Sequence, residues 1–385
     1  MGTAVESLTV VALTWAATRV LLVVVLLLVV LDGRSLDDAL RGWDAANYTR
    51  FAEHGYQNAT DYAFFPGLPL LLNGLSRLGL DAAHAGALVS LVCSALAAAA
   101  LYRLGAEGWG WGRRHQPVAG AIAACLWLLA PTTVFTTVAY TEAAFCAAAF
   151  WAWERARAGK WWLASLLAGI ACTLRVSGLF LVVALLVLAI VGNDPRDSRA
   201  RTMRGRLWNA AWLLVPMAVL FAYQYWLWTR TGSWMTWFQA QEQGWNREFT
   251  PPLEALQHTL AASDPAAWPD RPAVGWIFAA EIFSMALGVV ITLVCLMRRR
   301  WAEAVWVGLQ VAALGTSYWY MSINRAVLLW FPLFLALGAL FGGPFQRRTG
   351  GARTTAALAL GVVLTVSTGL VVTWAWLYFT GQWAS

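Results

Sequence analysis

Long apolar runs separated by short polar connections are the dominant pattern of this chain. The first run, Leu8 to Leu31, has Arg19 as its only charged residue, and it exceeds the roughly 20 apolar residues that cross a bilayer as a helix. It is too long for the apolar core of a signal peptide and no basic segment precedes it, so we expect a retained helix. Together the runs predict an all-α polytopic membrane protein with about eleven spans, at residues 8–31, 85–104, 117–133, 137–153, 161–174, 177–192, 208–228, 276–297, 302–320, 325–342 and 355–379.

One further apolar segment, residues 63–80 with the sequence AFFPGLPLLLNGLSRLGL, is not counted among the spans. Pro66 and Pro69 interrupt its first turn, and proline removes a helix hydrogen bond. Only about a dozen uninterrupted residues follow, which is too few to cross a bilayer. The segment therefore predicts an interfacial or re-entrant helix. If it were a full span, the predicted sidedness of the chain would be reversed.

Basic residues fall in alternate connections between the predicted spans, so every basic cluster lies on one side. The positive-inside rule makes this side cytoplasmic. The long connections 32–84 and 229–275 then face outward, and we expect a multi-pass protein of the plasma membrane. The clusters are Arg103 with Arg113 and Arg114; Arg155 with Arg157 and Lys160; Arg196, Arg199, Arg201, Arg204 and Arg206; Arg298, Arg299 and Arg300; and Arg347, Arg348 and Arg353.

Composition supports a membrane protein and limits the choice of partners. Of the 385 residues 60% are hydrophobic and only 12% are charged, which places most of the chain in lipid. The net charge of +7 does not indicate nucleic acid, because the arginines gather in short loops. No repeat or linker divides the chain, so we expect one membrane domain over residues 1–385. The cysteines lie in apolar runs without metal-ligand or CxxC spacing and are expected to be packing residues: Cys93, Cys125, Cys146, Cys172 and Cys295.

The first outward loop contains a polar helix. The run from Trp43 to Gly55 has helical spacing, and the glycine is typical of a helix end. Asp44 would stand at the first turn, where a carboxylate caps amide groups and complements the helix dipole. Alternatively, it is a general base. Tyr48 shares its face of the helix.

Two more polar residues end the same helix. Glu53 and His54 follow on the stripe adjacent to that of Asp44. They are either polar residues of a helix end at the water interface or substrate contacts, with His54 meeting a phosphate.

Three arginines fall on the same side as Asp44 in the predicted topology, namely Arg175, Arg247 and Arg325. A charged residue near a span is costly unless it is paired or faces a cavity. They are either snorkelling interfacial cations or bidentate phosphate ligands, a task that guanidinium performs better than ammonium. Glu142, in AYTEAAF, lies on this side as well and is a candidate charge partner for one of them.

Several of these segments together resemble a known family. The run GWDAANYTRFAEHGY followed by AFFPGLPLLL resembles the PIG-V family, the GPI mannosyltransferase II type and its bacterial relatives. Later blocks agree in order: AYTEAAF, TLRVSG, FQAQEQGWNR and NRAVLLWFPLF. The last departs from the family, whose members more often have a Pro-Arg-Tyr-like run around the position of Arg325. These blocks add Phe65, Gln243 and Trp245 to Trp43, Tyr48 and the polar residues above as candidate substrate contacts.

The resemblance implies a GT-C glycosyltransferase, an integral membrane enzyme that uses a lipid-linked sugar. The family's catalytic acidic residue in the first outer loop corresponds to Asp44. This implies inverting transfer of mannose from polyprenyl-phosphate-mannose to an acceptor hydroxyl outside the membrane, with Asp44 as the general base. The leaving phosphate needs a nearby cation rather than an acid, for which Arg325, Arg175, Arg247 and His54 are candidates in that order.

Other possibilities remain open at this stage. A lipid or glycolipid flippase would show internal repeats and broken, charged helices at the bilayer midplane, and a non-catalytic scaffold of the same family is a third reading. The acceptor is a glycolipid, a lipoglycan or a protein. No cofactor or metal is expected, because the spacing of the candidate oxygen ligands matches no compact metal loop. These ligands are Asp37, Asp38, Asp44 and Asp61.

Overall fold

The computed structural model of the chain describes residues 2–108, 116–192, 196–346 and 350–384. Within these ranges the chain is helical, and the only β-type pairing is an isolated antiparallel bridge between Phe249 and Ser317. The predicted all-α class is therefore confirmed. Four arginines of the predicted basic clusters lie outside the described residues: Arg113, Arg114, Arg347 and Arg348.

Each predicted span coincides with a helix or with a broken helix. The single helices are α1 (Gly2–Leu31), α5 (Ala82–Ala106), α6 (Pro117–Leu128), α7 (Glu142–Arg157), α8 (Trp161–Leu174), α9 (Ser177–Val191), α14 (Ala273–Met297), α15 (Trp301–Gly315) and α18 (Gly350–Phe379). The broken ones are α10 (Met203–Ala211) with α11 (Leu214–Thr231), and α16 (Ile323–Ala326) and η5 (Val327–Leu329) with α17 (Phe331–Gln346).

Length limits what these helices establish about crossing a membrane. Five stretches are long and apolar enough to span one, and a sixth qualifies if the pair bent by 67° at residue 330 is one span. The other five helices, α6 to α9 and α15, have 12 to 16 residues, fewer than the roughly 20 of a full crossing. The total of eleven spans therefore stays a prediction.

Two predicted boundaries differ from the structure at one turn. The span expected over residues 117–133 ends at Leu128, and the next begins at Glu142 rather than near residue 137. Pro131 explains the early stop, because proline cannot continue a helix and restricts the residue before it. The connection contains the short helix η2 (Thr133–Thr136).

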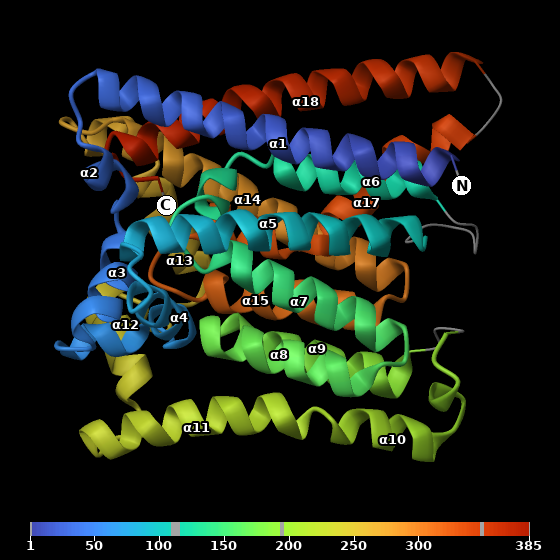
Figure 1. The fold of residues 1–385 in the computed structure, drawn as a ribbon, viewed down its shortest axis with the longest axis horizontal. Helices are drawn as coiled ribbons and strands as arrows, with labels where there is room; N and C mark the ends of the chain where they lie inside the picture. The colour runs from blue at the N-terminus through green and yellow to red at the C-terminus, as the bar shows by residue number, and fades with distance from the viewer. Residues whose placement is uncertain (1, 109–115, 193–195, 347–349, 385) are drawn as a thin grey trace.

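The short helices of the two predicted outer loops gather at one end of the molecule. Figure 1 shows α2, α3, α4 and α12 at the same end as the C-terminus, while the N-terminus lies at the opposite end. The elements of these loops are α2 (Leu36–Leu40), α3 (Asp44–His54), η1 (Ala59–Ala63), α4 (Gly67–Ser76), α12 (Thr236–Trp245), α13 (Pro252–Ala262) and η4 (Pro265–Ala267). Loops far apart in sequence thus build one surface.

The apolar segment expected to be a short helix forms α4, which has ten residues. At about 1.5 Å per residue such a helix is roughly 15 Å long, about half the thickness of the hydrocarbon core. α4 packs against α3, α5 and α8. A side chain at Gly67 would lie 2.7 Å from the carbonyl oxygen of Thr173, so glycine permits the close approach of α4 to α8.

Candidate functional site

A polar cavity of about 100 Å³ lies at the end formed by the outer-loop helices. α3, η1, α12, α16 and the turn between α8 and α9 contribute to its walls. Its polar and charged lining residues are Asp44, Tyr48, Arg175, Gln241, Arg247, Ser322 and Arg325. Its apolar lining residues are Ala63, Phe64, Phe65, Leu174, Val176, Trp237 and Trp245.

Asp44 is the first residue of α3 and is held by two contacts. Its backbone N–H donates to the Tyr140 hydroxyl at 3.1 Å, and its Oδ2 accepts from Arg325 Nη1 at 3.0 Å. Within the described ranges its carboxylate caps no helix amide. The interpretation of Asp44 as a helix cap is therefore not what the structure shows, because the carboxylate turns to Arg325.

Arg325 is almost buried and is surrounded by acceptors and rings. Besides Asp44, its Nη1 contacts Glu142 Oε1 at 3.4 Å, and its Nη2 donates to Ser322 Oγ at 2.9 Å. Its Cζ lies 5.3 Å from the centroid of the Tyr140 ring. A buried guanidinium is tolerated when it is paired and hydrogen-bonded in this way.

The segment that carries Arg325 is fixed from behind. Glu281 of α14 is fully buried, and its carboxylate accepts from the backbone N–H of Ser322 at 3.1 Å and of Asn324 at 2.9 Å. The bend that follows frees backbone carbonyls, which inside a membrane protein need other partners. The indole of Trp127 donates to the carbonyl oxygen of Leu328 at 2.9 Å. A second indole, from α15, donates to the carbonyl oxygen of Leu329.

Arg175 and Glu142 form the second ion pair. Glu142 has no exposed surface and lies behind the cavity wall, where its Oε1 accepts from Arg175 Nη1 at 2.5 Å. Arg175 also donates to Thr141 Oγ1 at 3.1 Å. Because the same oxygen contacts Arg325, one buried carboxylate holds two guanidinium groups side by side.

Arg247 is the third arginine of the cavity and differs from the other two. Its side chain makes no hydrogen bond or ion pair with any residue in the described ranges. Withdrawal from water, followed by the positive charges of Arg325 and Arg175, lowers the pKa of Arg247 to about 10. It stays charged at neutral pH, so the cavity presents an unbalanced positive charge that favours an anion.

Aromatic side chains form much of the remaining wall. Tyr48 and Phe64 meet edge to face at 5.2 Å, and Phe64 meets Trp245 at 5.3 Å. Burial and then the negative charge of Asp44 raise the pKa of Tyr48. Its hydroxyl therefore stays protonated and can donate a hydrogen bond.

Comparison with known proteins identifies the family of this chain. The model of the family described as "Mannosyltransferase (PIG-V)" matches residues 25–228, more than half of the chain. The chain belongs to the PIG-V mannosyltransferase family. The matched region contains Asp44, Glu142 and Arg175.

Curated PIG-V relatives are similar over part of their length. GPI alpha-1,6-mannosyltransferase 2 of Rattus norvegicus is 33% identical over 203 residues, covering 48% of this chain and 40% of that protein. The Homo sapiens protein of the same name is 36% identical over 150 residues, covering 36% of this chain and 29% of that protein. The match thus spans less than half of the length of these relatives.

Two solved structures are similar at a lower level. ArnT from Cupriavidus metallidurans, bound to undecaprenyl phosphate, has a TM-score of 0.49 and 16% identity, covering 96% of this chain and 76% of that one. The oligosaccharyltransferase AglB from Archaeoglobus fulgidus, in complex with an inhibitory peptide and a dolichol-phosphate, has a TM-score of 0.47 and 13% identity, covering 94% of this chain and 56% of that one.

Most residues singled out in the sequence of this PIG-V protein meet at the cavity. Asp44, Tyr48, Phe65, Arg175, Trp245, Arg247 and Arg325 line it, and Glu142 lies directly behind. Four others do not: Trp43, Glu53, His54 and Gln243.

Helical geometry explains why three of these residues lie outside the cavity. Glu53 lies nine residues after Asp44 and therefore on the opposite side of α3, where it pairs with Arg41. His54 is exposed at the end of the same helix. On α12, Gln241 and Trp245 are four residues apart and share the cavity face, whereas Gln243 points to solvent.

Trp43 lies outside the cavity but supports it. Its indole Nε1 donates to the carbonyl oxygen of Gln382 at 3.0 Å. This contact joins the start of α3 to the end of the chain. Trp43 adopts a positive φ of 54°, so the turn before Asp44 is an uncommon backbone conformation that tertiary contacts hold.

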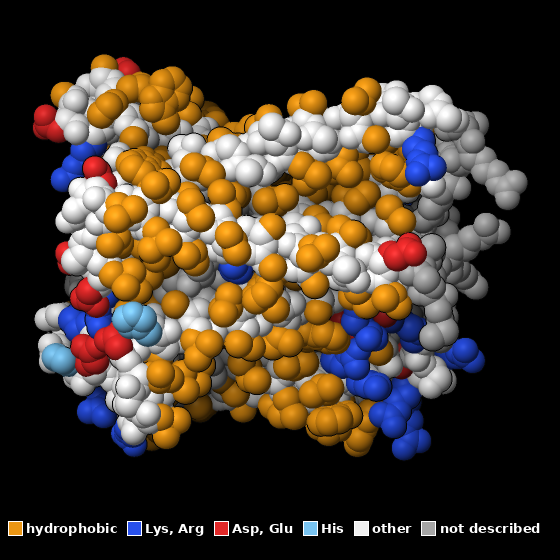
Figure 2. All heavy atoms as spheres, turned by 45° about the horizontal axis from the view of Figure 1, so that its top comes forward, with side chains coloured by type: hydrophobic (Ala, Val, Ile, Leu, Met, Phe, Trp, Pro, Cys, Tyr) orange, Lys and Arg blue, Asp and Glu red, His pale blue; other side chains and the backbone are white. Residues whose placement is uncertain are grey.

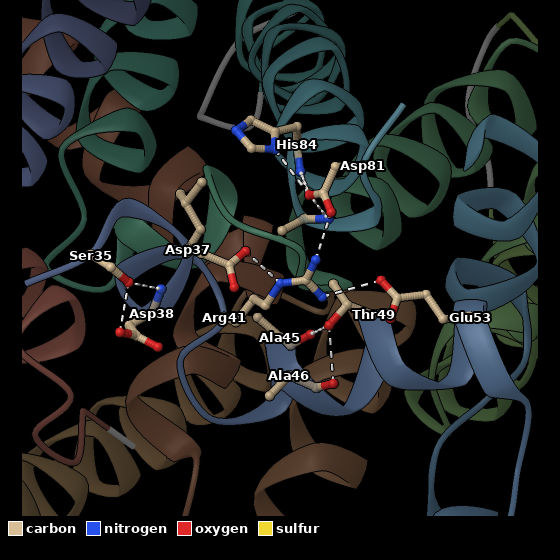
Figure 3. A network of polar contacts seen from close by, with 12 residues as sticks. Ser35, Asp37, Asp38, Arg41, Ala45, Ala46, Thr49, Glu53, Asp81 and His84 are labelled. Carbon is tan, nitrogen blue, oxygen red and sulfur yellow. Dashed lines mark hydrogen bonds and ion pairs between the residues drawn. The ribbon is translucent and has the colours of Figure 1, made fainter. Parts of the chain in front are cut away.

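An ion-pair network fixes the outer surface of α3 (Figure 3). The guanidinium of Arg41 contacts Asp37 at 2.7 Å, Glu53 at 3.3 Å and Asp81 at 2.6 Å, and Asp81 also meets His84 at 2.9 Å. These residues come from α2, α3 and the start of α5. The network therefore restrains the helix that begins with Asp44.

Sequence reasoning missed Gln241, Ser322, Tyr140 and Glu281. Gln241 and Ser322 lie within four residues of named candidates, so helical spacing and proximity were the available signals. Tyr140 and Glu281 are brought to the site only by packing between distant segments.

The four aspartates considered as metal ligands are engaged separately. Asp44 meets Arg325, Asp37 meets Arg41, Asp38 bonds Ser35 and Asp61 meets Arg50. In the described part of the chain no group of three or more metal-binding side chains is assembled. Catalysis without a metal stays a prediction.

Proposed function

We propose that this protein transfers mannose from polyprenyl-phosphate-mannose to an acceptor hydroxyl on the extracytoplasmic side of the membrane, with inversion at the anomeric carbon. The observation that carries the proposal is one cavity holding a carboxylate, Asp44, and three guanidinium groups, those of Arg175, Arg247 and Arg325. A base for the acceptor and cations for the leaving phosphate are the two requirements of this chemistry.

Asp44 is the general base in this mechanism. Its Oδ2 is bonded to Arg325, whereas Oδ1 has no hydrogen-bond donor among the described residues and is available to the acceptor hydroxyl. Asp44 takes the hydroxyl proton while the hydroxyl oxygen forms a bond to C1 of mannose. The bond between C1 and the phosphate oxygen breaks, and its electron pair leaves with the phosphate. A β-linked donor thus gives an α-mannoside.

The charges of the site match those of the reaction before and after transfer. The three cavity arginines and the two carboxylates that contact them, those of Asp44 and Glu142, sum to one positive charge, opposite to the single negative charge of a phosphodiester. Transfer neutralises Asp44 and converts the phosphodiester into a monoester whose second pKa is about 6. The site then carries two net positive charges against a phosphate near two negative ones.

An apolar cavity beside the polar one suits the lipid chain of the donor. Its volume is about 590 Å³, and its lining includes Phe51, Tyr56, Pro66, Leu70 and Trp226. The two cavities are neighbours, because residues adjacent in sequence line one each, at Phe65 with Pro66 and at Leu174 with Thr173. A polyprenyl chain in the apolar cavity would place its phosphate near Arg175.

Incubation of the purified protein with polyprenyl-phosphate-mannose and membrane extracts tests this function. We expect one class of acceptor, a glycolipid, a lipoglycan or a protein, to gain the mass of one hexose. Nuclear magnetic resonance of the product should show an α-linked mannose. Binding of the donor without a hexose product from any extract, or a β-linked product, contradicts the proposal.

A further inference from the structure

A second charged cavity lies around α10, at the end of the molecule opposite to α3 (Figure 1). It measures about 630 Å³, and its lining includes Arg199, Thr202, Arg204, Leu207 and Trp208. The proposed reaction uses none of these residues. They lie in and beside η3 (Arg199–Arg201) and α10.

The arginines of this region have no acidic partners within the described ranges. Arg199, Arg201 and Arg204 are exposed, and their side chains form no hydrogen bond or ion pair with any described residue. Two other arginines of the predicted basic clusters are paired: Arg103 contacts Glu154 at 3.0 Å, and Arg196 contacts Glu107 at 2.6 Å. Three arginines without an acidic partner among the described residues therefore lie close together in sequence at this cavity.

The turn that presents these arginines is built around a buried carboxylate. Asp197 Oδ1 accepts from the backbone N–H of Arg199 at 3.0 Å and of Ala200 at 3.2 Å. Its Oδ2 accepts from Trp161 Nε1 at 2.9 Å and from Asn209 Nδ2 at 2.7 Å. Because the backbone is already fixed, binding a ligand there orders little more than the arginine side chains.

An apolar strip continues from the cavity along the membrane-facing side of the same helical stretch. Met203, Leu207 and Trp208 are 62%, 58% and 57% exposed. Further along, Leu214 and Phe221 of α11 are 71% and 64% exposed. Figure 2 shows Lys and Arg side chains gathered beside hydrophobic ones at this corner of the molecule. A basic turn followed by such a strip is typical of a helix at a membrane interface.

We propose that this cavity binds the headgroup of an anionic phospholipid from the leaflet opposite to the catalytic cavity. Arg199 and Arg204 donate hydrogen bonds to the phosphate, for which guanidinium is well suited. Trp208 lies at the level of the headgroup, and the acyl chains follow the exposed side of α11. Basic pockets between or beside membrane helices recognise anionic headgroups in this way.

Native mass spectrometry of the protein released from vesicles tests the proposal. The vesicles contain phosphatidylcholine with a minor fraction of phosphatidylglycerol, and the number of retained phosphatidylglycerol molecules is counted. The variant R199Q/R204Q is compared with R299Q/R353Q, which loses the same charge outside the cavity. We expect R199Q/R204Q to bind phosphatidylglycerol about 25-fold more weakly, from roughly five-fold per arginine, and the control to bind as the wild type does.

Three results overturn the proposal. Equal losses in the two variants show that only net charge matters, and full retention by R199Q/R204Q shows that the cavity is not the site. Displacement of the lipid by millimolar inorganic phosphate shows a site for soluble anions instead. The melting temperature and the elution volume of both variants should equal those of the wild type, which shows that folded proteins are being compared.

Discussion

At the scale of single residues, the site depends on uncommon backbone conformations next to its charged groups. Trp43, Asn246 and Ser322 have positive φ values of 54°, 51° and 68°. Trp43 directly precedes Asp44, Asn246 directly precedes Arg247, and Ser322 accepts a hydrogen bond from Arg325. Such conformations typically cost about 1 to 3 kcal/mol for a residue other than glycine. Packing must hold them, which suits a site whose charges have to be placed before the substrate arrives.

Arg247 provides a prediction that separates binding from stability. Because its guanidinium has no partner among the described residues and is repelled by two other arginines, Arg247→Gln should leave the melting temperature unchanged or higher. The affinity of the variant for polyprenyl phosphate should fall about ten-fold or more, as expected when a charged contact to phosphate is lost. Fluorescence titration and thermal unfolding measure the two effects.

The matched control for Arg247 is Arg271→Gln, an exposed arginine of the same outer loop. It should change neither the affinity nor the melting temperature. A lower melting temperature of Arg247→Gln with unchanged affinity would assign Arg247 a structural role instead.

At the scale of elements, η1 forms one wall of the cavity, and hydrogen bonds to Asp61 join it to α3. Asp61 in η1 is buried and accepts from Arg50 Nη2 at 2.8 Å and from the backbone N–H of Gln57 and Asn58, each at 2.8 Å. Burial alone would raise the pKa of Asp61, but the Arg50 and amide hydrogen bonds outweigh it and hold the pKa below 3.8.

A depressed pKa makes the contribution of Asp61 dependent on pH. A carboxylate of this kind stabilises the fold above its ordinary pKa of 3.8, and the stabilisation is lost as the pH falls toward its folded pKa. Asp61→Asn should therefore lower stability by about 2 kcal/mol near neutral pH. The gap from the wild type should narrow as the pH drops below about 4, as melting temperatures across a pH series would show.

The exposed Asp270 gives the control for Asp61. Asp270→Asn should match the wild type at every pH. A gap between Asp61→Asn and the wild type that stays constant down to about pH 2.5 would show that the charge of Asp61 is not the source of the stabilisation.

At the scale of the whole molecule, hydrophobic runs predicted where the helices lie, because burial in lipid or core governs those positions. Loop charge placed Asp44 and the three arginines on one side, and the structure brings them to one cavity. The ion-pair partners were not predictable: Glu142 reaches both Arg175 and Arg325 because α7 packs against α8, which ends next to Arg175, and against η5, which follows Arg325. Gln241 lines the cavity and Gln243 does not, because residues two positions apart on a helix lie on different faces.

Cysteine labelling of cells tests the predicted sidedness. The native cysteines are buried or half-buried and should give little background. With a membrane-impermeant maleimide, Asp270→Cys should react in intact cells, whereas Lys160→Cys and Arg299→Cys, also exposed positions, should react only after permeabilisation. Equal labelling of all three before permeabilisation, or the reverse pattern, contradicts the predicted topology.

Asp44 removes the acceptor proton in the proposed mechanism, and the transfer rate of the Asp44→Asn variant measures its contribution. The substitution keeps the shape of the side chain and removes the base, so transfer should fall 100-fold or more, within the roughly 10²- to 10⁴-fold typical of a general base. Donor binding and folding should persist, and Asp38→Asn, an exposed acid of the same loop, should transfer normally. Near-normal transfer by Asp44→Asn, measured with a saturating donor, would show that Asp44 is not the general base.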